Sequence, residues 1–287
     1  MKKGWLVVNG FLQSSKFNEL YNFLLDAANE NGAELLLRTS SSLLSGEVDG
    51  FSQFEKPDFV LFWDKDVTLA KLLEKADFKL FNSAHAVEVC DSKVQTALVL
   101  QNKVPMPKTL FSPKTFEGVG YPDLHFVEQA AQVLGLPMVI KEAYGSFGQQ
   151  VYLANTLEEA KSIVQKLAGK DFVFQQFVSE SCGKDIRLNV VGGKVVNAIL
   201  RKSTTDFRSN ITLGGKCEGY IPTEEEKAVA ERACEIIGLD FAGVDVLFGK
   251  NGPLLCEVNS NMHFKTTYDC TGVDISKHIL RHILNTI

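Results

Sequence analysis

The chain has 287 residues, which is more than one hydrophobic core usually serves, so two or three packed units are expected. Apolar residues make up 45% and charged residues 23%, an ordinary globular composition that excludes a disordered or fibrous protein. The 30 basic and 35 acidic residues give a net charge of −5, which argues against a nucleic-acid-binding surface. No run of about 18 apolar residues predicts a membrane span. Six scattered cysteines that match no zinc pattern indicate reduced thiols in a cytoplasmic protein.

The first unit is predicted over residues 1–90, where short apolar strands alternate with amphipathic helices. This β-α-β alternation predicts a parallel sheet covered by helices. Trp5 and Trp63 are expected to be core residues rather than ligand platforms. The predicted strands are 5–8, 34–37, 59–63 and 80–81, and the predicted helices are 17–28 and 68–75.

The second unit is predicted over residues 91–178 and surrounds a glycine-rich loop. Asp91 is a good N-cap for a helix that reaches residue 102, and two prolines then break the pattern. Further helices are expected over 126–134 and after Thr156, and strands over 137–141, 151–153 and 172–178.

The third unit is predicted over residues 179–287 and begins with strands. Gly192 and Gly193 separate two apolar runs and predict a hairpin. The other expected elements are a capped helix that runs from Thr223 to before Gly238, strands over 241–248 and 254–258, and a last helix from about residue 274. The whole chain is therefore expected to have an α/β (α+β) fold.

The strongest chemical signal is an oxygen-rich group near the end of the chain. Glu257 and Asn259 are two apart on a predicted strand, so their side chains share one face, and Asp245 lies on the preceding strand. Such oxygen ligands suit Mg²⁺, which also keeps room for water and phosphates. The alternative is that Glu257 and Asn259 merely face water, but the apolar neighbours in this strand favour an internal position.

A second signal is Lys141 followed by Gly145, Ser146, Phe147 and Gly148. Glycines between two strands let backbone N–H groups approach phosphate oxygens, and the lysine supplies positive charge. The loop lacks the Gly-Lys-Ser/Thr ending of a P-loop and opens no helix, so neither P-loop nor Rossmann phosphate binding fits. Taken alone, the loop is equally compatible with an ordinary turn.

Three arginines form a third group, because guanidinium groups clamp phosphates and carboxylates bidentately. Arg187 and Arg201 lie on the two hairpin strands, and Arg208 follows in a polar loop. The alternative is a set of surface arginines. His263, which follows the acidic group, is either a structural residue or part of a substrate pocket.

The order of these features resembles the ATP-grasp superfamily, specifically its RimK-type α-L-glutamate ligase branch. The resemblance is close from about Asp91 to the C-terminus, and the first ninety residues share only the β-α alternation. The motifs that carry it are Pro137-Met138-Val139-Ile140-Lys141, Gly145-Ser146-Phe147-Gly148, Phe174-Gln175-Gln176-Phe177-Val178, Gly183-Lys184-Asp185-Ile186-Arg187, Phe207-Arg208-Ser209-Asn210, Gly243-Val244-Asp245 and Glu257-Val258-Asn259.

The resemblance implies an ATP-grasp fold with an N-terminal Rossmann-like domain, and it implies roles for individual residues. The implied ATP-binding residues are Lys93 and Lys141 at the α- and β-phosphates, the lid Gly145, Ser146, Phe147 and Gly148, the adenine hinge Gln175, Gln176, Phe177 and Val178, Asp185 near the ribose, and Arg187. The implied catalytic residues at the γ-phosphate and acyl group are Arg201, Arg208 and Asn210. The implied ligands of two Mg²⁺ ions, which Mn²⁺ could replace, are Asp245, Glu257 and Asn259.

The implied activity is an ATP-dependent carboxylate–amine ligase that passes through an acyl phosphate and releases ADP. It would add an amino acid such as glutamate to a protein tail, a carrier protein or a small molecule, and it would form a dimer or tetramer. The run Ser260-Asn261-Met262-His263-Phe264-Lys265 is closer to the amino-group-carrier-protein ligases of lysine and arginine biosynthesis, which leaves the added amino acid open. The alternatives are a non-catalytic ATP sensor and a kinase that stops at a phosphorylated product.

Overall fold

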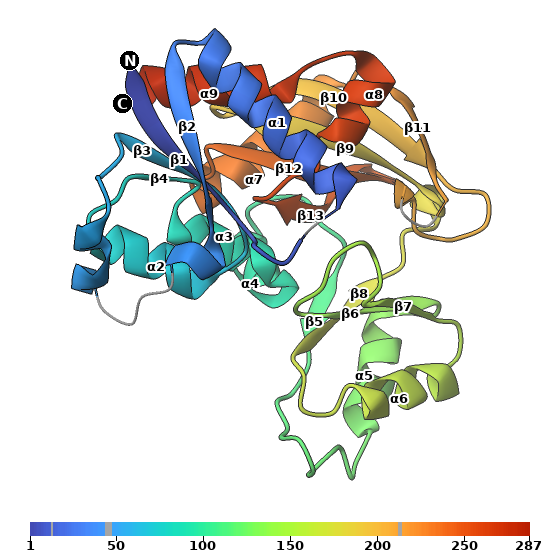
Figure 1. Cartoon of the computed structure of the whole chain (residues 1–287). Coiled ribbons are helices and arrows are strands. Elements are labelled where there is room, and N and C mark those ends of the chain that lie inside the picture. Colours follow the sequence, from blue (N-terminus) through green and yellow to red (C-terminus); the bar gives the residue numbers. More distant parts are fainter. Residues whose placement is uncertain (13, 44–47, 212–213) are drawn as a thin grey trace.

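The computed structural model describes residues 1–12, 14–43, 48–211 and 214–287, which form three β-sheets with helices packed on them (Figure 1). The first sheet has the order β2-β1-β3-β4 and all its strand pairs are parallel, as the β-α alternation predicts. Its strands are β1 (Lys2–Val8), β2 (Ala33–Thr39), β3 (Phe59–Trp63) and β4 (Leu80–Phe81).

Successive residues of β1 and β3 point to opposite faces of this sheet, and each face has its own core. Trp63 packs on one face together with α1 (Ser15–Glu30) and α9 (Ile275–Thr286). Trp5 packs on the other face with α2 (Val67–Lys75) and α3 (Ala84–Asp91). Both tryptophans are buried, so their prediction as core residues is confirmed.

The chain between the first and second sheets differs from the prediction. Asp91 is the last residue of α3, a helix that the sequence analysis missed, and not an N-cap. Helix α4 (Lys93–Leu100) begins after Ser92, whose hydroxyl accepts a hydrogen bond from the Gln95 N–H at 3.3 Å. Ser92, rather than Asp91, caps α4 because its hydroxyl reaches an N–H of the first turn that has no partner within the helix.

The second sheet has the order β5-β8-β6-β7 and is antiparallel. Helices α5 (His125–Leu134) and α6 (Leu157–Lys166) share one hydrophobic core with it. The predicted glycine loop lies between β6 and β7. The strands are β5 (Thr109–Phe111), β6 (Met138–Glu142), β7 (Val151–Ala154) and β8 (Phe172–Gln176).

The third sheet has the order β11-β10-β9-β12-β13 and is also antiparallel. Helix α7 (Glu224–Ile237) packs on it with residues of α3 and α4. The strands are β9 (Lys184–Val191), β10 (Lys194–Lys202), β11 (Lys216–Gly219), β12 (Phe241–Gly249) and β13 (Gly252–Asn259). The remaining elements are α8 (Lys265–Thr271) and the 3-10 helices η1 (Ser40–Leu43), η2 (Val48–Gln53) and η3 (Ser179–Ser181).

One expectation about the cysteines is wrong. Cys217 of β11 and Cys270 of α8 form a disulfide, with their Cα atoms 6.4 Å apart, although they are 53 residues apart in sequence. Four cysteines are free, at positions 90, 182, 234 and 256. The pairing follows from the packing of α8 against β11, which the spacing of the cysteines along the chain does not reveal.

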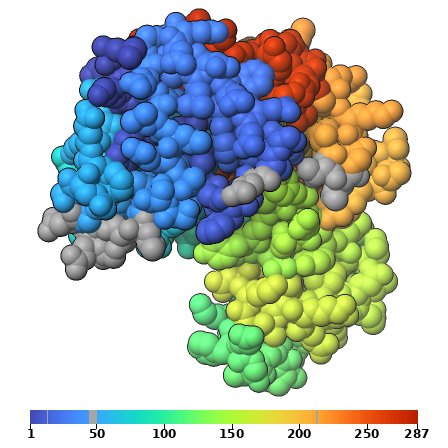
Figure 2. Space-filling model, in the orientation of Figure 1, coloured from blue at the N-terminus to red at the C-terminus, as the bar shows by residue number. Residues whose placement is uncertain are grey.

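The second sheet and its helices project from the rest of the molecule, in green and yellow below the blue N-terminal and the orange and red C-terminal parts (Figure 2). The first and third sheets are joined more closely, since Trp63 stacks on Phe241 with ring centroids 5.3 Å apart. Within the part of the chain that the structure describes, no helix is long and apolar enough to cross a membrane. The division into units at residues 90/91 and 178/179 stays a prediction, because α3 packs on both sides of the first boundary.

Candidate active site

Every predicted site residue lines one of two adjoining cavities. The first cavity lies between the second and third sheets, and the second lies between the third sheet, the glycine loop and the carboxyl ends of β1 and β3. Predicted residues on the first cavity alone are Lys93, Lys141, Gly145, Gly148, Gln175, Gln176, Phe177, Val178, Asp185, Arg208 and Asp245. Those on the second alone are Phe147, Arg187 and Asn259. Those shared by both are Ser146, Arg201, Asn210 and Glu257.

The predicted hinge, which consists of the last two residues of β8 and the two residues after it, lines the first cavity. The Gln176 N–H is already used, because it donates to the Lys108 carbonyl at 2.9 Å. The Val178 N–H donates to no group in the described residues, so it is free for the edge of a base. Val139 and Leu247 provide apolar walls that the sequence analysis did not identify. A flat aromatic ring with hydrogen-bonding edges therefore fits here.

Lys93 and Lys141 line the first cavity, and Lys65, which lines the second cavity, lies close enough to affect Lys93. Lys93 Nζ donates to the Gly145 carbonyl at 3.2 Å and lies 4.0 Å from the Glu257 carboxylate. Burial lowers the pKa of Lys93, Glu257 opposes this effect, and the nearby Lys141 and Lys65 reinforce it. Such a concentration of positive charge suits a polyphosphate.

Lys65 is a site residue that the sequence analysis missed. It follows β3, pairs with Asp91 at 3.0 Å and donates to the Ser146 hydroxyl at 3.3 Å. Its position after a parallel strand was a usable signal, since ligands of open α/β sheets bind at the carboxyl ends of strands.

The glycine loop is held against the segment that joins β10 to β11. Arg208 donates through Nη1 to the carbonyls of Gly148 and Val151 and is ion-paired with Asp206 at 2.7 Å. Gly148 has φ +74°, and a Cβ built there would lie 2.8 Å from Asn210 Oδ1. The loop thus touches two of the predicted catalytic residues, which matches a lid over the phosphate end of the cavity.

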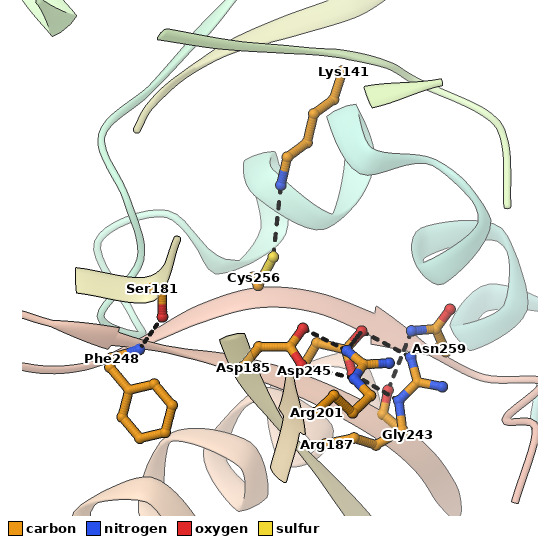
Figure 3. A network of polar contacts seen from close by, with 10 residues as sticks. All are labelled: Lys141, Ser181, Asp185, Arg187, Arg201, Gly243, Asp245, Phe248, Cys256 and Asn259. Atoms are coloured by element: carbon orange, nitrogen blue, oxygen red, sulfur yellow. Dashed lines mark hydrogen bonds and ion pairs between the residues drawn. The ribbon is translucent and has the colours of Figure 1, made fainter. Parts of the chain in front are cut away.

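Two arginines that were expected to be free for phosphate are instead paired with buried acids (Figure 3). Arg187 donates through Nε and Nη2 to both carboxylate oxygens of Asp245, at 2.7 Å each. Arg201 donates through Nε to Asp185 at 2.7 Å and pairs with Asp245 at 2.9 Å. Asp185, Arg201 and Asp245 are each less than 10% exposed. An unpaired charge would be costly there, so pairing is the stable arrangement.

The electrostatics of this network follow from the pairing. Burial alone would raise the pKa of the Asp245 carboxyl, but Arg187 and Arg201 together hold it below its ordinary value. Burial alone would lower the pKa of Arg201, but Asp185 and Asp245 hold it above its ordinary value. Asp245 is therefore anionic at neutral pH, as a metal ligand has to be.

The predicted metal ligands are close in the sheet, because β12 and β13 pair Asp245 with Glu257 and Gly243 with Asn259. The donors are all oxygen atoms, which fits Mg²⁺. Asp245 Oδ1 accepts one hydrogen bond and retains one acceptor position, whereas Oδ2 accepts two. Among the described residues, no group of three His, Cys, Asp or Glu side chains could hold a metal on its own. A cation here would thus need further oxygen atoms, as from nucleotide phosphates.

The second cavity contains residues from the first sheet that the sequence analysis did not identify. Asn9 follows β1 and Asp64 follows β3, at the edge where parallel strands end. His263 lines the same cavity, and neither ring nitrogen has a hydrogen-bond partner in the described residues. Burial, with Lys16 and Arg187 nearby, lowers the pKa of His263 to about 4. His263 thus lies at the cavity and packs against Phe17, and both of its predicted roles stay open.

The chain is similar in sequence to proteins of one family. The model of the RimK-like ATP-grasp domain family matches residues 90–283. A probable alpha-L-glutamate ligase of Syntrophotalea carbinolica is 36% identical over 206 residues, which are 70% of this chain and 66% of that protein. Human N-acetylaspartylglutamate synthase A is 33% identical over 228 residues, which are 78% of this chain and 57% of that protein.

A solved structure shows the same fold along almost the whole chain. The RimK domain ATP-grasp protein of Sphaerobacter thermophilus superimposes with a TM-score of 0.71 and 20% sequence identity, and it covers 96% of this chain and 98% of its own. The mixed α/β architecture that the sequence motifs imply is confirmed. The role of each residue in the two cavities stays a prediction.

Proposed function

Because the chain belongs to the RimK-like ATP-grasp family, whose members are ATP-dependent ligases, we propose that it joins a carboxylate to an amine with ATP and Mg²⁺. The observation that carries this proposal is the shared wall of the two cavities. Ser146, Arg201, Asn210 and Glu257 line both, so a nucleotide in the first cavity would direct its terminal phosphate towards a substrate in the second. Transfer between two sites needs this arrangement.

In the proposed reaction, a substrate carboxylate attacks the γ-phosphorus of ATP, and ADP leaves. An amine then attacks the acyl phosphate, phosphate leaves, and an amide bond forms. Lys93 and Lys141 would bind the α- and β-phosphates, and Arg208 would hold the glycine loop over them. Arg201 and Asn210 would contact the transferred phosphate and the acyl group, which mostly requires positioning and charge neutralisation.

The proposed metal ligands are Asp245, Glu257 and Asn259, with Glu257 shared between two ions. Mg²⁺ would reduce the repulsion between the anionic carboxylate and the triphosphate. The residues of the chain keep Asp245 ionised and leave one acceptor position on its Oδ1.

The proposed substrates are an amino acid such as glutamate and a carboxylate on a small molecule, a carrier protein or a protein tail. The relatives support this, since one is a probable alpha-L-glutamate ligase and another is N-acetylaspartylglutamate synthase A. We further propose a cytoplasmic homo-oligomer that binds neither nucleic acid nor membrane, in agreement with the net charge of −5.

The experiment that tests the proposal is an ADP-release screen with the purified protein, ATP and Mg²⁺. Pairs of amino acids and candidate carboxylates are supplied, and products are examined by mass spectrometry. The expected result is ADP and phosphate only when both substrates are present, with a product mass equal to their sum minus water. AMP and pyrophosphate would contradict the proposal, because they indicate adenylate chemistry.

The same screen tests the two alternatives. A sensor would bind ATP without any acceptor-dependent hydrolysis. A kinase would release a stable phosphorylated product in the absence of an amine, which phosphorus NMR would detect. Either outcome would replace the ligase proposal.

A further inference from the structure

The disulfide between Cys217 and Cys270 joins two elements at the second cavity. Cys217 lies in β11, at the edge of the third sheet, and it is paired across the strands with Arg201 of β10, which lines both cavities. Cys270 lies in α8, and Thr266 and Thr267 of the same helix line the second cavity. The disulfide therefore fastens one wall of this cavity to the edge of the third sheet.

Helix α8 has little buried surface of its own. All its residues are described, and Thr267 alone among them is buried. The Thr267 hydroxyl accepts from Asn189 Nδ2, and the Thr271 hydroxyl accepts from Asn197 Nδ2, each at 3.2 Å. The Oδ1 atoms of both asparagines are buried without a partner in the described residues, which is unfavourable. These two neutral hydrogen bonds hold α8 to the sheet weakly, so the disulfide is the strong link between α8 and β11.

The linked cysteines are accessible to small thiols from solution. Cys217 and Cys270 are partly exposed, whereas Cys90 and Cys234 are buried. Burial raises the pKa of the Cys90 thiol to about 12, so almost none of it is thiolate at neutral pH. Thiol–disulfide exchange needs an attacking thiolate and access to the sulfur atom that is attacked. Exchange with dissolved thiols can therefore occur at the pair that joins β11 to α8 and not at the buried cysteines.

We infer that Cys217 and Cys270 are a reversible thiol–disulfide site, and that their reduction releases α8 from β11 and loosens the wall of the second cavity. In a cytoplasmic protein, as proposed above, disulfides are usually transient and redox-sensing rather than structural. Oxidation of the pair removes two protons and two electrons from the thiols. Both pass to a small disulfide such as glutathione disulfide, which becomes two thiols, and reduction is the reverse reaction. The inference rests on the proposed function only in treating this cavity as a substrate site.

Reduction leaves both elements with weaker attachments. Strand β11 has four residues and is the last strand of its sheet, so it is paired on one side, with β10. Helix α8 keeps its aromatic contact with α1, where the ring centroids of Tyr268 and Phe23 lie 4.8 Å apart. Local opening is therefore expected where α8 meets β11, while the central strands of the sheet stay closed.

The test uses the full chain in glutathione buffers that range from reduced to oxidised. Alkylation without denaturant, followed by peptide mass spectrometry, should find Cys217 linked to Cys270 in the oxidised buffer and two free thiols in the reduced one. Backbone hydrogen exchange over residues 216–219 and 265–271 should be about 10-fold or more faster in the reduced chain. Exchange in β12, which lies between β9 and β13, should be the same in both buffers.

The double variant Cys217→Ser with Cys270→Ser, checked for folding by circular dichroism, should exchange as the reduced wild type does in both buffers. The matched control is Cys182→Ser, which removes an exposed free cysteine and should keep the wild-type response. The measurements on the wild type stand without either variant.

A disulfide that persists in the folded chain in reduced glutathione would overturn the inference, because the bond would then be structural. Absence of the link in oxidised glutathione, or equal hydrogen exchange in the two buffers, would overturn it as well. None of these measurements uses turnover, so the outcomes are distinct from failure of the ligase reaction, which the ADP-release screen reports.

Discussion

At the scale of single residues, the buried Asp245 of β12 and the partly exposed Glu257 of β13 differ in what they can bind. Both oxygens of Asp245 accept hydrogen bonds from arginines, so this carboxylate is largely occupied. Glu257 lines both cavities and has Lys93 as its ion-pair partner, at the long distance of 4.0 Å. Glu257 is therefore the acid best placed to share a cation with substrate phosphates.

Glu257→Gln should lower the rate of ADP release roughly 100-fold or more, because an amide replaces the charge at the shared wall. The fold should be retained, which circular dichroism checks. The control is Glu218→Gln, which removes a surface carboxylate paired with Lys202 and should keep the wild-type rate. A wild-type rate in Glu257→Gln would remove the proposed metal role.

The low pKa of His263 predicts how the stability of the fold depends on pH. Its pKa is about 4 in the folded chain against an ordinary value of 6.5, so the unfolded chain binds more protons between these values. The His263 contribution to stability is thus complete above pH 6.5 and is lost as the pH falls towards 4, with a loss of roughly 2 kcal/mol at pH 5.

His263→Phe abolishes this titration and removes two buried nitrogens that lack partners. The free energy of unfolding of the variant, relative to the wild type, should be larger at pH 5 than at pH 7 by roughly 2 kcal/mol. Urea denaturation at both pH values measures the difference. An equal difference at the two pH values would contradict the low pKa.

The sequence predicted the residues of the first cavity better than those of the second. Lys141, the glycine loop and Glu257 belong to local motifs whose spacing places them on strands and turns. Asn9, Lys65 and Asp64 carry no such motif, because only the parallel pairing of β1 and β3 brings them to one edge of the sheet. The pairing of Arg187 with Asp245 also depends on the register between β9 and β12.

At the scale of elements, the loop between β6 and β7 depends on a close approach to the segment that joins β10 to β11. Gly148 has positive φ, and its α-carbon faces Asn210 without room for a side chain. The loop can therefore lie against Arg208 and Asn210 only because residue 148 is glycine.

Gly148→Ala should raise the KM for ATP and lower kcat, together about 10-fold or more, because the added methyl group holds the loop away from the phosphate end. Gly118→Ala is the matched control, since Gly118 also has positive φ but a Cβ there would meet nothing within 4 Å. Steady-state kinetics of both variants is the measurement. Both substitutions place alanine at positive φ, but only Gly148→Ala also brings a methyl group against Asn210, so the difference between them isolates the effect of that contact. Equal effects in the two variants would show that the approach to Asn210 is unimportant.

Elements with a clear local pattern were predicted well from the sequence, including the two-residue β4, whereas α3 and two strands were missed. Strand β3 has the predicted bounds, and helices α5 and α7 begin and end near the predicted positions. Strands β5 and β11 have three and four residues and lack alternation, so pairing with β8 and β10 determines them. Their conformation comes from tertiary contacts rather than from local propensity.

At the scale of the whole molecule, the two ends of the chain share one core. Side chains of β1, β3 and α1 pack with Phe241, Phe264 and α9, and the N- and C-termini lie side by side (Figure 1). Contacts of such large sequence separation leave no local pattern, which is why the sequence alone predicted separate units but not how they join. Because the core is continuous, the first and third sheets should unfold together.

Asn82 is the main polar connection between these sheets and is fully buried. Its Nδ2 donates to the carbonyls of Phe241 and Ser260 at 2.9 and 3.1 Å, and its Oδ1 accepts from the N–H groups of Asp240 and Phe241 at 2.8 and 3.2 Å. Alanine would leave these buried backbone groups without partners. Asn82→Ala should therefore lower the free energy of unfolding by roughly 2 to 4 kcal/mol.

Urea denaturation followed by tryptophan fluorescence measures this loss, because Trp63 lies at the same junction. The transition should move to lower urea and remain single, since the apolar core still joins the two sheets. Asn251→Ala, in the exposed turn between β12 and β13, is the control and should change stability by less than about 0.5 kcal/mol. Two separate transitions in Asn82→Ala would mean that this asparagine, rather than the shared core, couples the first sheet to the third.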